Sequence, residues 1–180
     1  MPDHSDGEVK AMSHDTPGRA PVNLQLRAAV VADCDALAGV WHAAWHDAHA
    51  PLVSRALLPH RARPYFEALA HKQYAAITVA EQAGQISGFV GIDDDELELL
   101  FVSAAARGSG VADALIQHGE RQLARHHAQG YLVVVEGNAR ARRFYERHGW
   151  HDAGPLSFAA PIPGGSILVP SRRYEKQLRG

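Results

Sequence analysis

The sequence has little of several features that would assign a chain to a particular class of protein. Its 180 residues include a single cysteine, Cys34, and their formal net charge is −2. No apolar run approaches the ~20 residues that a membrane-spanning helix needs, and the polar N-terminus lacks the apolar core of a signal peptide. The weak charge argues against a nucleic-acid partner or a membrane surface, so any anion site must be built locally. A lone cysteine excludes an internal disulfide and fits a reducing, cytoplasmic compartment.

What is present indicates one α/β domain. Residues 1–22 are polar, marked by proline and glycine, and without periodicity, which predicts a flexible tail before a domain over 23–180. Apolar residues recurring every three or four positions, or every second position, predict alternating helices and strands. The expected helices cover 33–48, 64–72, 139–148 and a segment that starts after Gly110 and is ended by Gly130. The expected strands cover 23–27, 75–81, 85–92, 96–102, 131–136, 150–158 and 166–177.

A glycine-containing turn joins one of these strands to a helix, in the stretch LLFVSAAARGSGVADALI over residues 99–116. Asp113 stands where a dinucleotide-binding fingerprint needs its third glycine, and no Gly-Lys-Ser/Thr triplet follows, which excludes a P-loop. What remains is a tight turn that exposes the backbone amides of about residues 108–112 at a helix N-terminus. Such amides bind phosphate, although a lone glycine turn is about as often purely structural.

A second motif accompanies the turn. Arg107-x-x-Gly110-x-Ala112 is followed, after a predicted strand, by NARARRFYERHGW over residues 138–150. Together the two motifs resemble those of the GNAT superfamily of N-acetyltransferases. The resemblance implies a splayed, mixed, mostly antiparallel β-sheet with helices on both faces, and acetyl-CoA as co-substrate in the gap between two strands.

The resemblance also implies which residues meet the cofactor. The pantetheine arm would lie along the strand before the turn, and Asn138 would hydrogen-bond it. The diphosphate would rest on the amides of the turn beside Arg107. Arg143, together with Arg140 and Arg142, would face the nucleotide phosphates, although alternating arginines are also typical of a solvated helix face. The predicted cofactor-binding residues are Phe101, Val102, Ser103, Arg107, Gly108, Ser109, Gly110, Val111, Ala112, Asn138 and Arg143.

Acyl transfer to an amine needs two proton-handling groups, because an ammonium cannot attack a thioester and a leaving thiolate benefits from a proton. In the family a tyrosine after the phenylalanine gives that proton, and Tyr145 matches it; the alternative is a core tyrosine with a satisfied hydroxyl. For the base, Glu98 is the first candidate, with Glu96 and water as alternatives. Alternation predicts that both glutamates share one face with Leu100 and Val102. Glu136 lies too near a turn to align.

The resemblance therefore predicts direct transfer of an acetyl group, in a ternary complex, to a primary amine of a small molecule or a peptide. A coenzyme A-binding module without turnover is the alternative, and a homodimer is left open. His42, His46 and His49 recur along one side of the first helix and raise the question of a metal. No carboxylate or cysteine at ligand spacing completes such a site, so a polar helix face is the preferred interpretation and no metal is expected.

Overall fold

The computed structural model describes residues 23–179, so the predicted flexible tail over 1–22 lies outside the described residues. Its strands form one seven-stranded mixed sheet in the order β1-β2-β3-β4-β5-β7-β6. Only β4 and β5 run parallel; every other neighbouring pair is antiparallel. The strands are β1 Leu24–Ala28, β2 Ile77–Gln82, β3 Gln85–Asp93, β4 Glu96–Val102, β5 Gln129–Val135, β6 His151–Ile162 and β7 Gly165–Gln177.

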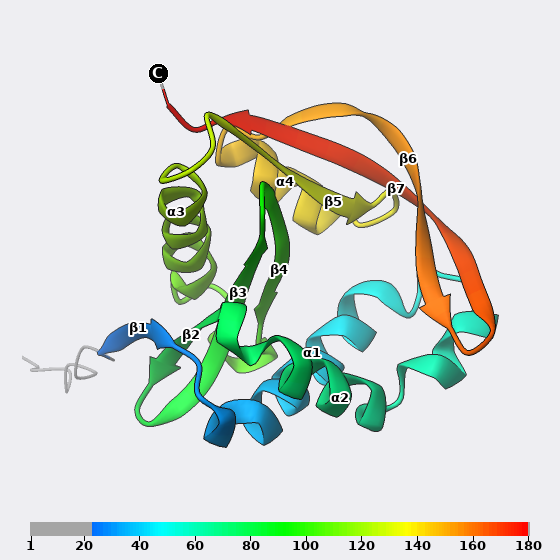
Figure 1. The fold of residues 1–180 in the computed structure, drawn as a ribbon, viewed down its shortest axis with the longest axis horizontal. Helices are drawn as coiled ribbons and strands as arrows, with labels where there is room; N and C mark the ends of the chain where they lie inside the picture. The colour runs from blue at the N-terminus through cyan, green and yellow to red at the C-terminus, as the bar shows by residue number, and fades with distance from the viewer. Residues whose placement is uncertain (1–22, 180) are drawn as a thin grey trace, which may run out of the picture.

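Helices cover both faces of the sheet (Figure 1). The α-helices are α1 Cys34–His49, α2 Arg63–Gln73, α3 Val111–Leu123 and α4 Ala139–Arg147. Short 3-10 helices are η1 Val31–Asp33, η2 Arg55–Arg61, η3 Tyr74–Ala76 and η4 Ala104–Ala106. Buried apolar residues of α1 and α2 pack on one face, and those of α3 and α4 pack on the other, which confirms the predicted fold class. No helix within residues 23–179 is long and apolar enough to cross a membrane.

Two predicted boundaries were wrong. Helix α3 ends at Leu123, the last residue of its buried stripe, and not at Gly130. Gly130 lies inside β5, where an added Cβ would lie 3.0 Å from Leu123 Cδ1, so this glycine permits close packing. The hairpin of β6 and β7 is also longer than predicted, because the prolines at 155 and 161 are tolerated in an edge strand.

A β-bulge in β4 overturns the predicted alternation. Gly91 of β3 pairs with Leu99 and Ile92 pairs with Leu97, which leaves Glu98 as the extra residue. Leu97 consequently packs in the α3 cluster and Leu99 in the α1–α2 cluster, on opposite faces of the sheet. Glu98 therefore does not share a face with Leu100 and Val102, which pack against the α3 cluster. It turns toward the end of α2 instead, where the Gln73 side chain donates to it over 3.5 Å.

Strands β4 and β5 meet at one end only. Glu96 and Tyr131 form the single residue pair of their ladder, reinforced by a hydrogen bond from the Tyr131 N–H to the Asp95 carbonyl of 3.0 Å. Beyond that pair β5 follows β7 along its whole length, and β4 follows β3. The two strands therefore diverge, as Figure 1 shows. The splayed sheet predicted from the family resemblance is confirmed.

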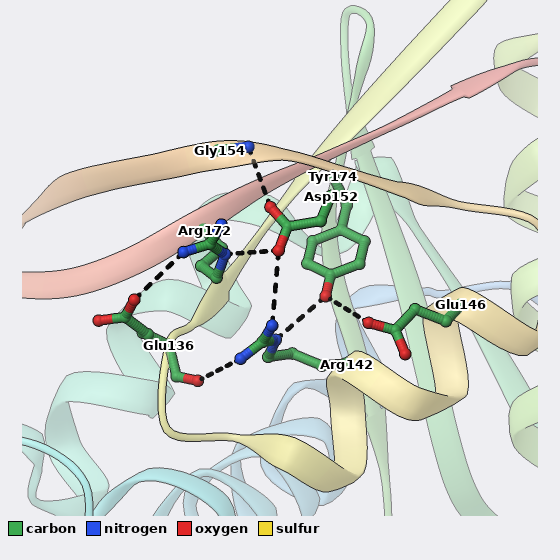
Figure 2. A network of polar contacts seen from close by, with 7 residues as sticks. All are labelled: Glu136, Arg142, Glu146, Asp152, Gly154, Arg172 and Tyr174. Carbon is green, nitrogen blue, oxygen red and sulfur yellow. Dashed lines mark hydrogen bonds and ion pairs between the residues drawn. The ribbon is translucent and has the colours of Figure 1, made fainter.

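A polar network fixes α4 against the hairpin of β6 and β7 (Figure 2). The Arg142 Nε donates to the Tyr174 hydroxyl over 3.1 Å, and that hydroxyl donates to Glu146 over 2.9 Å. Arg172 pairs with Asp152 at 2.5 Å, and Asp152 also lies 3.5 Å from Arg142. Because the Tyr174 ring is fully buried, these contacts hold α4 in a defined position beside the diverging strands.

The backbones of β3 and β4 lie so close at Gly88 that a substitution there tests the packing of the two strands. An added Cβ at Gly88 of β3 would lie 2.8 Å from the Phe101 carbonyl oxygen, a backbone atom that cannot move cheaply. We expect Gly88→Ala to lower the free energy of unfolding by about 1–3 kcal/mol, measured by urea denaturation. Gly165→Ala is the control, since nothing lies within 4 Å of its added Cβ. Equal stability of the two variants would contradict the proposed clash.

Candidate active site

The diverging strands β4 and β5 enclose a cleft of about 540 Å³. Ten of the thirteen residues predicted for the site line it: Glu98, Phe101, Val102, Arg107, Gly108, Gly110, Ala112, Asn138, Arg143 and Tyr145. The other three do not line it. The Ser103 N–H donates to the Ser87 carbonyl over 2.8 Å, and the Ser109 hydroxyl donates to the Ala106 carbonyl over 2.6 Å. The Val111 side chain is fully buried.

The turn before α3 presents free amides to the cleft. Gly108 and Gly110 have φ values of 73° and 84°, in the left-handed region that favours glycine. The first intrahelical bond runs from the Ala114 N–H to the Gly110 carbonyl over 3.0 Å. Because Gly110, the N-cap, has no side chain to cap the helix, the amide of the cleft-lining Ala112 stays available to a ligand. An anion placed there would also meet the positive end of the helix dipole.

Four arginines line the same cleft as these amides: Arg107, Arg140, Arg143 and Arg147. Arg142, predicted together with Arg140 and Arg143, instead points into the network behind α4. An acidic residue that the sequence did not reveal, Asp47 of α1, lies between two of the arginines. Its Oδ2 is 2.5 Å from Arg107 and 3.3 Å from Arg140. The cleft is therefore a local cationic site in a chain whose net charge is slightly negative.

Tyr145 is buried at the cleft wall, with 9% of its surface exposed. Burial raises the pKa of its hydroxyl above the usual range, so the group keeps its proton at neutral pH. None of the hydrogen bonds among residues 23–179 involves this hydroxyl, whereas the hydroxyl of Tyr174 has two partners. The arrangement expected of a satisfied core tyrosine is therefore found at Tyr174 and not at Tyr145.

Asn138 has a structural role in addition to lining the cleft. Its Oδ1 accepts a hydrogen bond from the Ala141 N–H over 3.1 Å and so caps the N-terminus of α4. This leaves the Nδ2 as the side-chain group that can donate to a ligand. The motif residue thus positions α4, and with it Tyr145, at the edge of the cleft.

The three glutamates considered from the sequence have different surroundings. Glu98 lines the cleft, and its pKa is raised, mainly by burial and then by the nearby carboxylate of Glu96. Glu96 does not line the cleft. Burial raises its pKa as well, although a hydrogen bond of 2.9 Å from the Tyr131 hydroxyl acts in the opposite direction. Glu136 accepts from Arg172 over 3.2 Å. Of the three, only Glu98 faces the cleft.

The histidines of α1 are distributed among aromatic side chains. The His42 ring packs against His46 and Phe66, and the His46 Nε2 lies 2.6 Å from the Arg61 carbonyl. His49 lines the cleft, and burial lowers its pKa to about 4. Residues 23–179 contain no group of three or more His, Cys, Asp or Glu that could hold a metal ion. Sequence reasoning noted His49 only as the third histidine along one side of the first helix and did not single it out as a cleft residue.

A family model described as an acetyltransferase (GNAT) domain matches residues 54–163. The chain belongs to this family. The matched segment contains the glycine turn, the diverging strands, α4 and β6, so the GNAT assignment rests on the elements that build the cleft. A search of curated proteins found no match.

Solved structures share the GNAT fold of this chain at low sequence identity. A GCN5-related N-acetyltransferase from Rhodopseudomonas palustris aligns with a TM-score of 0.68 and 18% identity over 87% of this chain and 95% of its own. The PaiA N-acetyltransferase from Thermoplasma acidophilum, solved with coenzyme A, aligns with a TM-score of 0.64 and 15% identity over 86% and 99%. YncA from Salmonella typhimurium, solved with acetyl-CoA, aligns with a TM-score of 0.64 and 18% identity over 88% and 95%.

The raised pKa of Glu98 has a consequence for stability. Between its unfolded and folded pKa values the native GNAT domain binds more protons than the unfolded chain, so the contribution of Glu98 to stability falls as pH rises. Glu98→Gln removes that dependence. We expect the variant to gain stability over the parent at about pH 7, and to gain less at about pH 4, in urea denaturation at both pH values. A difference independent of pH would show that Glu98 is not destabilised by its surroundings.

Proposed function

We propose that this GNAT protein is an N-acetyltransferase. It moves an acetyl group from acetyl-CoA to a primary amine of a small molecule or a peptide, by direct transfer in a ternary complex. The observation that carries the proposal is the Tyr145 hydroxyl, protonated and without a protein partner among the described residues, at the wall of the cleft between the diverging strands. The solved relatives that hold coenzyme A or acetyl-CoA support the choice of cofactor.

The cleft suits a long thioester with a diphosphate at one end. The inner edge of β4 at Phe101 and Val102 faces no β5 partner, so its backbone can pair with the amides of a pantetheine arm. The Asn138 Nδ2 can donate to the same arm. The amides of Gly108, Gly110 and Ala112 can hold the diphosphate, beside Arg107. Arg143 of α4 lines the same cleft and can pair with the nucleotide phosphates.

Acetyl-CoA supplies an activated acyl group, and the chain's residues handle the protons. As the amine nitrogen bonds to the acetyl carbon, the carbon–sulfur bond breaks and the sulfur needs a proton. We assign that proton to the Tyr145 hydroxyl, which its surroundings keep protonated. The acid then recovers its proton from solvent or from the amine side of the cleft.

Glu98 is our candidate for the base that takes a proton from the substrate ammonium, so that the neutral amine can attack. The β-bulge turns its side chain toward α2, and it lines the cleft. A raised carboxyl pKa makes it a better proton acceptor than a glutamate whose pKa is unshifted. The Glu98→Gln variant should also lose turnover, partly recovered at high pH where more of the amine is already neutral. Water remains the alternative base, and an unchanged pH–rate profile would favour it.

Tyr145→Phe tests the acid. The substitution keeps the ring and its packing, so stability and coenzyme A affinity should change little while turnover falls ~10²–10⁴-fold, the usual contribution of a general acid. Thermal unfolding, calorimetry with coenzyme A, and thiol release with a panel of amines should be measured on one preparation. A protein that binds coenzyme A but releases no thiol with any amine would be the non-catalytic module instead.

Tyr174→Phe is the matched control for this experiment. Its hydroxyl bonds Arg142 and Glu146, so its loss removes two hydrogen bonds to charged groups and should lower stability by about 1–3 kcal/mol. Turnover per folded molecule should fall far less than in Tyr145→Phe, because Tyr174 does not line the cleft and acts only through the position of α4. If Tyr145→Phe shows this same pattern, Tyr145 is removed from the mechanism.

Gly110→Asp tests the diphosphate cradle, since it places bulk and negative charge at the uncapped start of α3. Calorimetry should show coenzyme A binding reduced by at least about tenfold. Gly164→Asp is the control: it has a similar positive φ of 80°, with nothing within 4 Å of its added Cβ, in the β6–β7 turn. Both variants carry the same backbone strain, but only Gly110→Asp should lose binding. Undiminished binding by folded Gly110→Asp would refute the cradle.

A further inference from the structure

Asp47 joins two cleft walls through one oxygen atom. It lies in the last turns of α1, and its Oδ2 contacts Arg107 from the turn after β4 at 2.5 Å and Arg140 from α4 at 3.3 Å. Both arginines line the cleft, and they come from segments on either side of the gap between β4 and β5. One carboxylate thus links guanidinium groups from both sides of the gap.

The bridge is built from groups that can exchange partners. All three side chains are substantially exposed, with 48% of Asp47, 38% of Arg107 and 58% of Arg140 accessible. Neither arginine has another ion-pair partner among residues 23–179. The two arginines, Arg107 first, lower the pKa of Asp47, so the carboxylate is charged at neutral pH. Exposed pairs of this kind are weak, and a diphosphate with more charge and more acceptor oxygens can replace one carboxylate.

We propose that Asp47 competes with the cofactor's diphosphate for Arg107 and Arg140, and so sets how tightly coenzyme A is held. This inference rests on the proposed function. In the free protein the carboxylate occupies the arginines; on binding it gives them up to the phosphates. When product leaves, Asp47 takes them back. Because acetyl-CoA and the product coenzyme A carry the same diphosphate, Asp47 weakens both and assists release of the product.

Calorimetry with coenzyme A on Asp47→Asn tests the competition. The variant should bind about three- to tenfold more tightly than the parent at low ionic strength, with the gain shrinking as salt screens the arginines. Asp35→Asn is the matched control. Asp35 is another exposed carboxylate of α1, 2.6 Å from Arg63, and neither residue lines the cleft, so this variant should match the parent.

Two fragments of coenzyme A show whether the gain in affinity depends on the diphosphate. Dephospho-coenzyme A keeps the diphosphate and should show the same gain in Asp47→Asn, whereas pantetheine has no phosphate and should show none. A gain with pantetheine, or none with dephospho-coenzyme A, would overturn the proposal, as would unchanged or weaker binding of coenzyme A. If the parent binds no coenzyme A, the proposed function itself has failed. A parent that binds normally, with an unaltered Asp47→Asn, defeats only the role of Asp47.

Discussion

The divergence of β4 and β5 is the constraint on which the rest of the structure depends. A parallel pair that met along its length would satisfy its own backbone groups and leave no gap. Here one pair, Glu96 with Tyr131, joins the strands, and β5 takes β7 as its full-length partner. The inner backbone of β4 at Phe101 and Val102 therefore has no strand beside it and lies open to the cleft, where a ligand that pairs as an added strand would meet it.

The same divergence sets where the charges and the proposed proton donor, Tyr145, lie. The chain leaves β4, turns through two left-handed glycines into α3, and returns as β5, so the uncapped helix start lies at the open end of the gap. Helix α4 follows β5 directly, capped by Asn138 and held behind by Arg142 and Tyr174. Its other side brings Tyr145 to the cleft wall. A rigid rear contact and a free hydroxyl in front are what a positioned acid requires.

The fold, the glycine turn and the place of Tyr145 could be predicted because local motifs carry them: glycines that can adopt positive φ, helical spacing, and the family resemblance of the segment from Asn138 to Trp150. The residues that sequence reasoning missed depend on contacts far along the chain. The bulge at Glu98 arises from the register between β3 and β4, which alternation within one strand cannot reveal. Asp47 meets arginines 60 and 93 positions away, and nothing in the local sequence of α1 distinguishes it from Asp35.

The prolines of β6 affect the solubility of the folded protein. This edge strand spans twelve residues, long enough to attract another chain's strand. Pro155 and Pro161 are an even number of positions apart and have no N–H, and the ladder with β7 tolerates them only if the missing donors lie on the open side. The open edge of β6 therefore cannot form a regular hydrogen-bonded ladder with another strand. The opposite edge of the sheet, β1, has only five residues. Self-association through strand addition is thereby disfavoured at both edges of the sheet, whereas the gap between β4 and β5 stays open to a small extended molecule.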